Sequence, residues 1–236
     1  MPFSPSANVY NAINQAYRDY ISQSETIVNW VMERKPNASS LLDVACGTGL
    51  HLSYLKSSFD VYGVDISPAM IKLAISNNPG INFYIGDMQD FQINSRFDVV
   101  TCLFSSITYV GSIEALNATI ANFAKHLQPN GICILEPYIP LEAWRDGVIG
   151  FRKVESDDRK IAMIDRADRN NRMVRREIAY IVATSKKIEQ IYEEHSFMLF
   201  TRMEYENAFR LAGFKIDFIE NGFAEGRGMY VGILQS

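Results

Sequence analysis

The feature that most constrains the fold is a short, mostly apolar run that ends in closely spaced glycines. Residues 40–46, SLLDVAC, precede Gly47, Thr48 and Gly49. An apolar run of this length predicts a buried strand, and glycines let the backbone turn tightly and approach a ligand closely. A buried strand followed by such a turn and a helical stretch favours an α/β fold with helices on both faces of the sheet.

The same alternation of strands and helices recurs along most of the chain. Strands are predicted at 60–65, 81–86, 97–104, 132–137, 214–220 and 229–235, and helices at 68–77, 113–127 and 201–213. Ser67-Pro68 is a typical helix start, and Pro129-Asn130-Gly131 is expected to end the helix at 113–127. Including the first strand, this pattern predicts a seven-stranded, mostly parallel sheet.

Two segments depart from this rhythm. Residues 148–200 alternate apolar and polar positions, with turn-like sequences at 168–171 and 185–187, which predicts an antiparallel insertion of three or four strands. Residues 1–35 read as helical and end at Pro36-Asn37. We therefore expect one domain, 1–236, with a helical cap at 1–35 and the insertion at 138–200.

Composition excludes several classes of protein. The chain has 236 residues, 47% apolar residues and a formal net charge of −4, which gives no reason to expect binding to nucleic acid or to an anionic membrane. It has no apolar run of about 18–20 residues, and its first residues do not resemble a secretory signal. Cys46, Cys102 and Cys133 lie in predicted strands without a CxxC motif, so we expect neither disulfides nor a metal site. A cytoplasmic location is the expectation.

Acidic residues at the ends of two further strands indicate what the glycine turn binds. Asp65 ends the second strand, 16 residues after Gly49, and could accept both hydroxyls of a ribose. Asp87-Met88 follows the third strand and could accept from an adenine amine and cover its ring. Each feature has a plain alternative: a tight turn for the glycines, a helix cap for Asp65 and a turn residue for Asp87. Leu52 replaces the third glycine of a dinucleotide fingerprint, which disfavours a pyrophosphate there.

Residues 40–136 resemble the class I S-adenosylmethionine methyltransferases in the order of these features. The resemblance implies a Rossmann-like fold whose last strand is antiparallel, with S-adenosyl-L-methionine as cofactor. It also implies a set of cofactor-binding residues: Ala45, Gly47, Gly49, Asp65, Asp87, Met88 and, at the end of the fourth strand, Leu103.

A narrower resemblance covers nearly the whole chain. The chain is similar to the nucleotide-amino-sugar N,N-dimethyltransferases in these segments: SSLLDVACGTG, GDMQDF, FSSITYV, FAKHL with PNG, Glu136-Pro137, the insertion ending in His195 and MLFTR, and Gly226-Arg227-Gly228. This similarity implies transfer of methyl groups to the amino group of a nucleotide-linked amino sugar. The insertion is then expected to cover the mouth of the substrate site.

The narrower resemblance assigns roles to individual residues. It implies that Arg227 meets the substrate's phosphates, that His126 lies near the reacting amine, and that Tyr10 and Tyr20 fold over the cofactor. The plain alternatives are a solvated hairpin arginine, a helix-terminal histidine favoured by the helix dipole, and aromatic residues that pack an amphipathic helix. His195 matches a family histidine, although an ordinary strand residue is the alternative there.

The substrate side departs from the family pattern. Phe3-Ser4-Pro5 stands where the family has a tyrosine, Tyr138 and Ile139 replace paired tryptophans, and Arg166 falls near a family histidine. We therefore take Tyr138, Arg166, His195 and Arg227 as the candidate substrate-binding residues, with no metal ligands.

Other functions stay open at this point. The first alternative is a methyltransferase for another small acceptor: an amine, a carboxylate or a carbon nucleophile. The second is a cofactor-binding protein without catalysis. An NAD-dependent dehydrogenase is disfavoured by Leu52, and nucleic-acid methylation by the net charge and by FSSI after the fourth strand. The oligomeric state is open, with a homodimer as one alternative.

Overall fold

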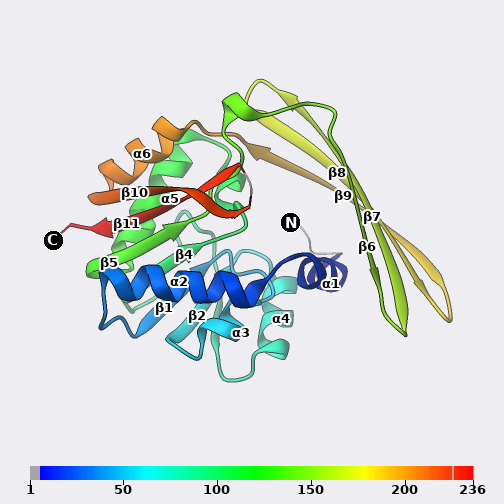
Figure 1. Ribbon diagram of the computed structural model, residues 1–236, viewed down its shortest axis with the longest axis horizontal. Helices are drawn as coiled ribbons and strands as arrows, with labels where there is room; N and C mark the ends of the chain where they lie inside the picture. The colour runs from blue at the N-terminus through cyan, green and yellow to red at the C-terminus, as the bar shows by residue number, and fades with distance from the viewer. Residues whose placement is uncertain (1–5, 225, 236) are drawn as a thin grey trace.

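The chain forms two β-sheets that stand side by side (Figure 1). The computed structural model describes residues 6–224 and 226–235. The larger sheet has seven strands in the order β10-β11-β5-β4-β1-β2-β3, and the smaller has the order β6-β7-β8-β9. The helices are α1 (Ala7–Tyr17), α2 (Tyr20–Arg34), α3 (Leu52–Leu55), α4 (Pro68–Asn77), α5 (Ile113–Lys125) and α6 (Arg202–Leu211), with 3₁₀ turns η1 (Ser106–Val110) and η2 (Leu141–Ala143).

The strands of the larger sheet confirm the predicted architecture. They are β1 (Ser40–Val44), β2 (Asp60–Asp65), β3 (Asn82–Ile85), β4 (Phe97–Cys102), β5 (Leu127–Leu135), β10 (Phe214–Ala224) and β11 (Arg227–Leu234). β1 to β5 pair in parallel, whereas β11 pairs antiparallel with both β5 and β10. The sheet is therefore seven-stranded and mostly parallel, and its last strand is antiparallel as expected.

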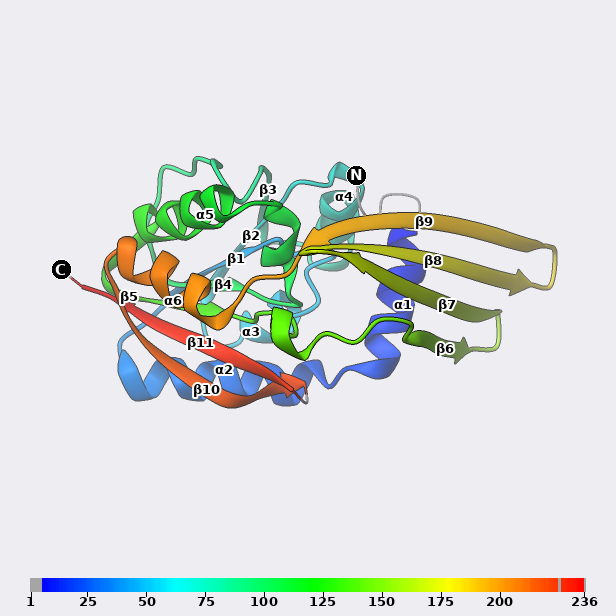
Figure 2. The same ribbon diagram turned by 90° about the horizontal axis from the view of Figure 1, so that it is seen from above.

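Each face of the larger sheet carries its own core. Leu42 and Val100 pack with apolar side chains of α5 and α6, whereas their neighbours Leu41 and Val99 pack with α2, α3 and α4. Successive strand residues point to opposite faces, so a continuous apolar run fills both cores at once. Figures 1 and 2 show the helices on either side of this sheet.

The predicted insertion is a long four-stranded antiparallel sheet, made of β6 (Ile149–Glu155), β7 (Arg159–Asn170), β8 (Met173–Thr184) and β9 (Ile188–Met198). It projects beside α1 (Figures 1 and 2). Val9 and Ile13 of α1 pack against Met163 and Tyr180 on its inner face. None of the described helices is long and apolar enough to cross a membrane.

Local signals at the helix ends are mostly as expected. The Ser67 hydroxyl accepts from Met70 N, and Thr201 and Glu204 form a reciprocal capping box. The predicted end of the helix at 113–127 is corrected, because α5 ends at Lys125 and Pro129-Asn130-Gly131 lies inside β5. In this region β4 advances two residues, from Phe97 to Val99, while the paired β5 advances five, from Leu127 to Ile132. The extra residues of β5 form a bulge, which the positive φ of Asn130 allows.

Asp43, in the middle of β1, makes the stability of the fold depend on pH. Its buried carboxyl accepts from Thr101 Oγ1 at 2.7 Å, yet burial raises its pKa to about 7. The unfolded value is about 4, so the folded state keeps a proton that the unfolded chain releases between these two pH values. The free energy of unfolding should therefore fall as pH rises from about 4 to 7.

We expect Asp43→Asn to raise the melting temperature at pH 8 relative to wild type and to flatten this pH dependence. The amide oxygen can still accept from Thr101, and no charge need be buried. Thermal unfolding at pH 5 and pH 8 measures this, with Asp157→Asn on an exposed turn as the control. A lower melting temperature of Asp43→Asn at pH 8 would contradict the prediction.

Candidate active site

A cavity of about 1000 Å³ lies between the two sheets. Its lining comes from α1 and α2, the segments that follow β4 and β5, the inner face of β6–β9, the end of β10 and the start of β11. This position borders the carboxyl ends of the parallel strands, where open α/β sheets bind their ligands. The volume is at the upper end of the range for small-molecule sites, about 300–1,000 Å³.

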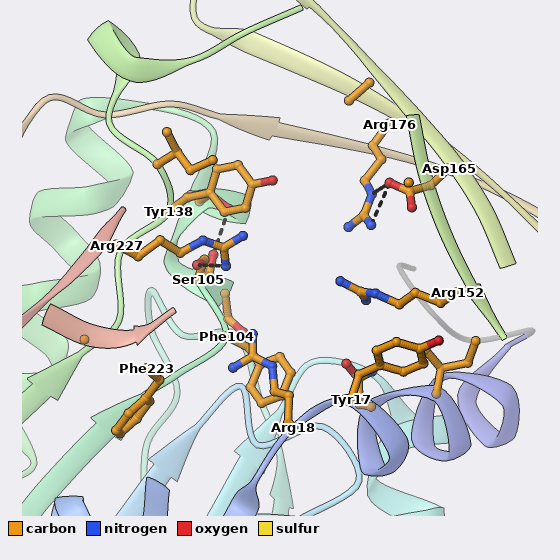
Figure 3. Close-up of a pocket in the computed structure, with 18 of the residues that line it drawn as sticks. Tyr17, Arg18, Phe104, Ser105, Tyr138, Arg152, Asp165, Arg176, Phe223 and Arg227 are labelled. Atoms are coloured by element: carbon orange, nitrogen blue, oxygen red, sulfur yellow. Dashed lines mark hydrogen bonds and ion pairs between the residues drawn. The ribbon is translucent and has the colours of Figure 1, made fainter. Parts of the chain in front are cut away.

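Five arginines line this cavity: Arg18, Arg145, Arg152, Arg176 and Arg227. Figure 3 labels four of them, which come from different elements. Arg176 Nη2 forms an ion pair with Asp165 Oδ2 at 2.8 Å, and Arg18 Nη1 lies 3.7 Å from Glu136 Oε1. Among residues 6–224 and 226–235, no carboxylate lies within ion-pair distance of Arg152 or Arg227. These two cations are therefore available to an anionic ligand.

Arg227 and Tyr138 lie together in the cavity. The guanidinium carbon of Arg227 lies 4.4 Å from the centre of the Tyr138 ring, and its Nη1 donates to Ser105 Oγ at 3.4 Å. Burial lowers the pKa of Arg227, but a guanidinium stays charged at neutral pH. A charged, partly desolvated arginine is suited to binding phosphate oxygens.

The turn after β1 is held by one carboxylate. Gly47 N donates to Asp65 Oδ2 at 2.8 Å, and Ser67 N donates to Asp65 Oδ1 at 2.8 Å. Burial raises the pKa of Asp65, and the two backbone hydrogen bonds act against this rise. Each carboxylate oxygen can accept a second hydrogen bond, so Asp65 can still bind a pair of hydroxyls.

The two glycines of this turn have different surroundings. A Cβ at Gly49 would lie 2.9 Å from Asn78 Nδ2 and 3.1 Å from the Phe83 ring, and φ there is +74°. A Cβ at Gly47 would meet no atom within 4 Å, although φ is +56°. The chain therefore packs closely behind Gly49 and leaves open space beside Gly47. Ala45 also has a positive φ, of 57°, which fits the tight turn.

The remaining predicted cofactor residues lie along the same edge of the sheet. Asp87 follows β3 and accepts from Gln89 N at 2.9 Å, and Met88 comes next. Leu103 is buried and follows β4, on the other side of β1. These positions run along the carboxyl ends of neighbouring strands, and their contact with a cofactor stays a prediction.

The α1–α2 segment covers this edge. The Tyr20 ring stacks on the Phe104 ring with the ring centres 5.8 Å apart, and the guanidinium carbon of Arg18 lies 3.3 Å from the centre of the Phe104 ring. Thr48 Oγ1 donates to Asn11 Oδ1 at 2.5 Å, which joins the glycine turn to α1. Tyr10 lines the cavity, and burial raises its pKa to about 12.

Buried polar atoms remain beside this cover. Glu136 Oε2 accepts from Phe104 N at 2.8 Å. Glu136 Oε1 and Arg18 Nη1 are buried and have no hydrogen-bond partner within the described part of the chain. These two atoms could form hydrogen bonds with the polar end of a ligand. Together with the turn held by Asp65 and the open space beside Gly47, they fit a small polar cofactor carrying a ribose.

His126 is not part of this cavity, and the prediction that it lies near the reacting amine is wrong. Its Nδ1 lies 2.9 Å from Asn122 O, its Nε2 accepts from Ile93 N at 3.2 Å, and its carbonyl accepts from Phe97 N at the start of β4. The residue therefore stands at the amino edge of the sheet, opposite the cavity. Both ring nitrogens serve the backbone.

Arg166 faces away from the cavity, so the prediction that it binds substrate is also wrong. Met163, Asp165 and Ala167 of β7 line the cavity, so the alternation of side chains puts Arg166 on the outer face of the smaller sheet. There it forms ion pairs with Asp168 and Glu177. The substitution noted at Phe3-Ser4-Pro5 lies outside the described residues.

His195 is buried on β9 and does not itself line the cavity. Its Nδ1 lies 3.1 Å from the hydroxyl oxygen of Tyr109, which does line it.

Sequence reasoning missed several lining residues. They are Arg18, Tyr109, Arg152, Asp165 and Arg176. One signal could have found part of this set: Asp165 shares the period-two face of β7 with the buried Ile161 and Met163. A charged residue in phase with a buried apolar stripe indicates a polar site.

Comparisons with known proteins agree with this geometry. Residues 41–131 match the family model described as "Methyltransferase domain". The chain is 37% identical to a dTDP-3-amino-3,4,6-trideoxy-alpha-D-glucopyranose N,N-dimethyltransferase of Streptomyces venezuelae, over 92% of each protein.

Solved structures are similar over almost the full length. The crystal structure of Streptomyces venezuelae DesVI has a TM-score of 0.93 at 35% identity, covering 98% of each chain. CalS10, an amino pentose methyltransferase from Micromonospora echinaspora solved with SAM bound, has a TM-score of 0.87 at 32% identity, covering 95% of this chain and 96% of that one. The chain therefore belongs to the S-adenosylmethionine-dependent methyltransferases, in the group of the nucleotide-amino-sugar N,N-dimethyltransferases.

Proposed function

We propose that this enzyme transfers methyl groups from S-adenosylmethionine to the amino group of a nucleotide-linked amino sugar. The observation that carries the proposal is the position of Arg227, whose guanidinium reaches Ser105 just beyond the end of β4. A cation suited to a diphosphate thus lies next to the segment that follows β4, which lines the cavity. Asp65 and Asp87 do not line the cavity themselves but follow neighbouring strands at the same edge of the sheet.

The cofactor edge is proposed to hold S-adenosylmethionine through Asp65 on the ribose, Asp87 and Met88 on the adenine, and the glycine turn beside the methionine part. S-adenosylmethionine supplies a methyl group already activated on a sulfonium: as the amine lone pair forms the new C–N bond, the C–S electrons stay on sulfur, and the amine's surplus proton leaves to solvent. The protein's task is to orient the amine and exclude water.

The cavity favours the neutral form of an amine, which is the nucleophilic form. Five arginines line it, whereas its lining carboxylates are Asp19 and Asp165, and Glu136 lies beside Arg18. Like charges nearby disfavour an ammonium and lower the pKa of the amine that produces it. A diphosphate neutralises the arginine that binds it, so the arginines left without an anionic partner are the ones that would help the bound amine lose its proton.

Aromatic side chains at one end of the cavity suit a nucleobase. Trp30 and Phe223 stack with ring centres 5.7 Å apart and planes 12° from parallel, and both line the cavity. Flat apolar surfaces of this kind bind planar rings by stacking. We place the base near this pair and the amino sugar toward the smaller sheet, with the diphosphate at Arg227 between them.

The test is to incubate the purified enzyme with S-adenosylmethionine and a thymidine-diphosphate 3-amino-3,6-dideoxyhexose, and to analyse the sugar nucleotide by mass spectrometry. A gain of one or two methyl groups supports the proposal. No gain, while calorimetry shows that S-adenosylmethionine binds, would overturn the amino-sugar acceptor and favour another small acceptor.

We expect Arg227→Ala to raise both the Kd for thymidine diphosphate and the KM for the sugar nucleotide about ten- to hundredfold, because hydrogen bonds from a cation to phosphate are lost. The Kd for S-adenosylmethionine should stay the same. Arg166→Ala, which removes an arginine from the outer face, is the matched control and should change none of these values. An unchanged Kd for thymidine diphosphate in Arg227→Ala would rule out this phosphate anchor.

His126→Ala tests the correction made above. We expect kcat and KM to match wild type, while the free energy of unfolding falls by about 1–3 kcal/mol, because the backbone N–H of Ile93 loses its acceptor. Steady-state kinetics and urea unfolding measure the two effects. A large loss of kcat with unchanged stability would return His126 to the active site.

A further inference from the structure

A chain of three polar side chains links the buried part of β9 to the cavity. Glu193 and His195 are 7% and 2% exposed and occupy alternate positions of the strand, so both point to the inner face of the smaller sheet. His195 Nε2 lies 3.2 Å from Glu193 Oε2, and His195 Nδ1 lies 3.1 Å from Tyr109 Oη. Of the three, Tyr109 lines the cavity.

Glu193 determines which atom donates in each of these hydrogen bonds. Ser6 donates to Glu193 twice, from its N–H at 3.2 Å and from its hydroxyl at 2.9 Å. A carboxylate only accepts, so His195 must donate to it from Nε2. When the imidazole is neutral, Nδ1 is its acceptor, and Tyr109 donates its hydroxyl proton to Nδ1. The lone pairs of the Tyr109 oxygen then remain as acceptors, and Tyr109 lines the cavity.

Tyr109 stands where an acceptor amine would meet the cofactor edge. It lies in η1, which begins directly after Ser105, the residue that Arg227 contacts. A diphosphate held by Arg227 would therefore place the attached sugar close to η1. This step rests on the function proposed above.

We propose that Glu193 and His195 are positioning residues that keep Tyr109 Oη as a hydrogen-bond acceptor for an N–H of the substrate amine. The amine lone pair is then free to point toward the methyl group. With the opposite polarity, the Tyr109 hydroxyl would donate to that lone pair and occupy the electrons that form the C–N bond. No proton moves along the chain, because the product's surplus proton leaves to solvent.

The first test needs no ligand. Nitrogen-15 NMR of the histidine side chains, with His195 assigned by His195→Gln, reports which ring nitrogen carries the proton. We expect the Nε2–H form for His195 in the wild-type enzyme. A proton on Nδ1, in either the neutral Nδ1–H form or the imidazolium, would overturn the proposal, because Tyr109 would then accept from His195.

The second test is a double-mutant cycle on Tyr109→Phe and Glu193→Gln. Tyr109→Phe should lower kcat about tenfold, the equivalent of one hydrogen bond, with little change in the KM for the sugar nucleotide or the Kd for thymidine diphosphate. Glu193→Gln, which no longer fixes the histidine tautomer, should lower kcat in the wild-type background but not in Tyr109→Phe.

Glu194→Gln is the matched control, because Glu194 lies on the outer face of the same strand and pairs with Arg175. It should leave kcat unchanged. Equal effects of Glu193→Gln in both backgrounds would show that Glu193 only anchors Ser6, and a normal kcat in Tyr109→Phe would remove Tyr109 from the reaction; either overturns the proposal. If the wild-type enzyme methylates no amino sugar, the proposed function fails instead, whatever the NMR shows.

Discussion

The carboxylate of Asp65 is the interaction on which the cofactor side of this enzyme depends. It joins the backbone N–H of Gly47, in the turn after β1, to that of Ser67, at the start of α4. The turn can therefore take positive φ values without losing its place relative to β2. Removing this carboxylate would take away the acceptor of both hydrogen bonds and would free the turn from its neighbouring strand.

The substrate side depends on a different kind of contact. The smaller sheet cannot bury its inner face alone, and α1 covers it through Val9 and Ile13. At the other end of the same segment, Arg18 packs on Phe104 and approaches Glu136 beyond the end of β5. The helical cap thus contacts both sheets, and the cavity is the space that this three-way packing encloses.

This arrangement separates the two chemical tasks. The parallel sheet presents short turns and carboxylates that suit a ribose and an adenine, whereas the antiparallel sheet supplies long side chains at every second position. Arg176 and the Glu193–His195 pair come from that second set. The smaller sheet thus contributes the far wall of the substrate site, while Arg227 and Tyr109 complete that site from the larger sheet.

The sequence was most informative where the signal is local. The glycine turn, Asp65 and the capping box at Thr201 can be recognised from neighbouring residues, because a tight turn or a helix start demands particular residue types. The seven-stranded sheet followed from the regular alternation of strands and helices. Arg227 was found by its flanking glycines and by resemblance to a family.

Residues whose position depends on how distant strands and helices pack together could not be predicted from their neighbours in the sequence. His126 is the exception, because the predicted order of a helix followed by a parallel strand already implies that this helix ends at the amino edge of the sheet, away from the ligand edge. The assignment from family resemblance overlooked this signal. Arg166 was assigned to substrate binding without knowing which residues of β7 face the cavity. A shift of one residue along a strand moves a side chain to the opposite face of the sheet. Tyr109 and His195 are 86 residues apart, and only the packing of β9 against η1 brings them together.

The most direct measurement is a crystal structure of the enzyme with S-adenosylhomocysteine and the thymidine-diphosphate amino sugar bound. We predict adenosine hydroxyls on Asp65, the diphosphate on Arg227, and the sugar nitrogen within hydrogen-bonding distance of Tyr109 Oη. A diphosphate bound away from Arg227, or a sugar nitrogen held by other groups with Tyr109 turned away, would contradict the view that one cavity joins a phosphate anchor to a methyl-transfer centre.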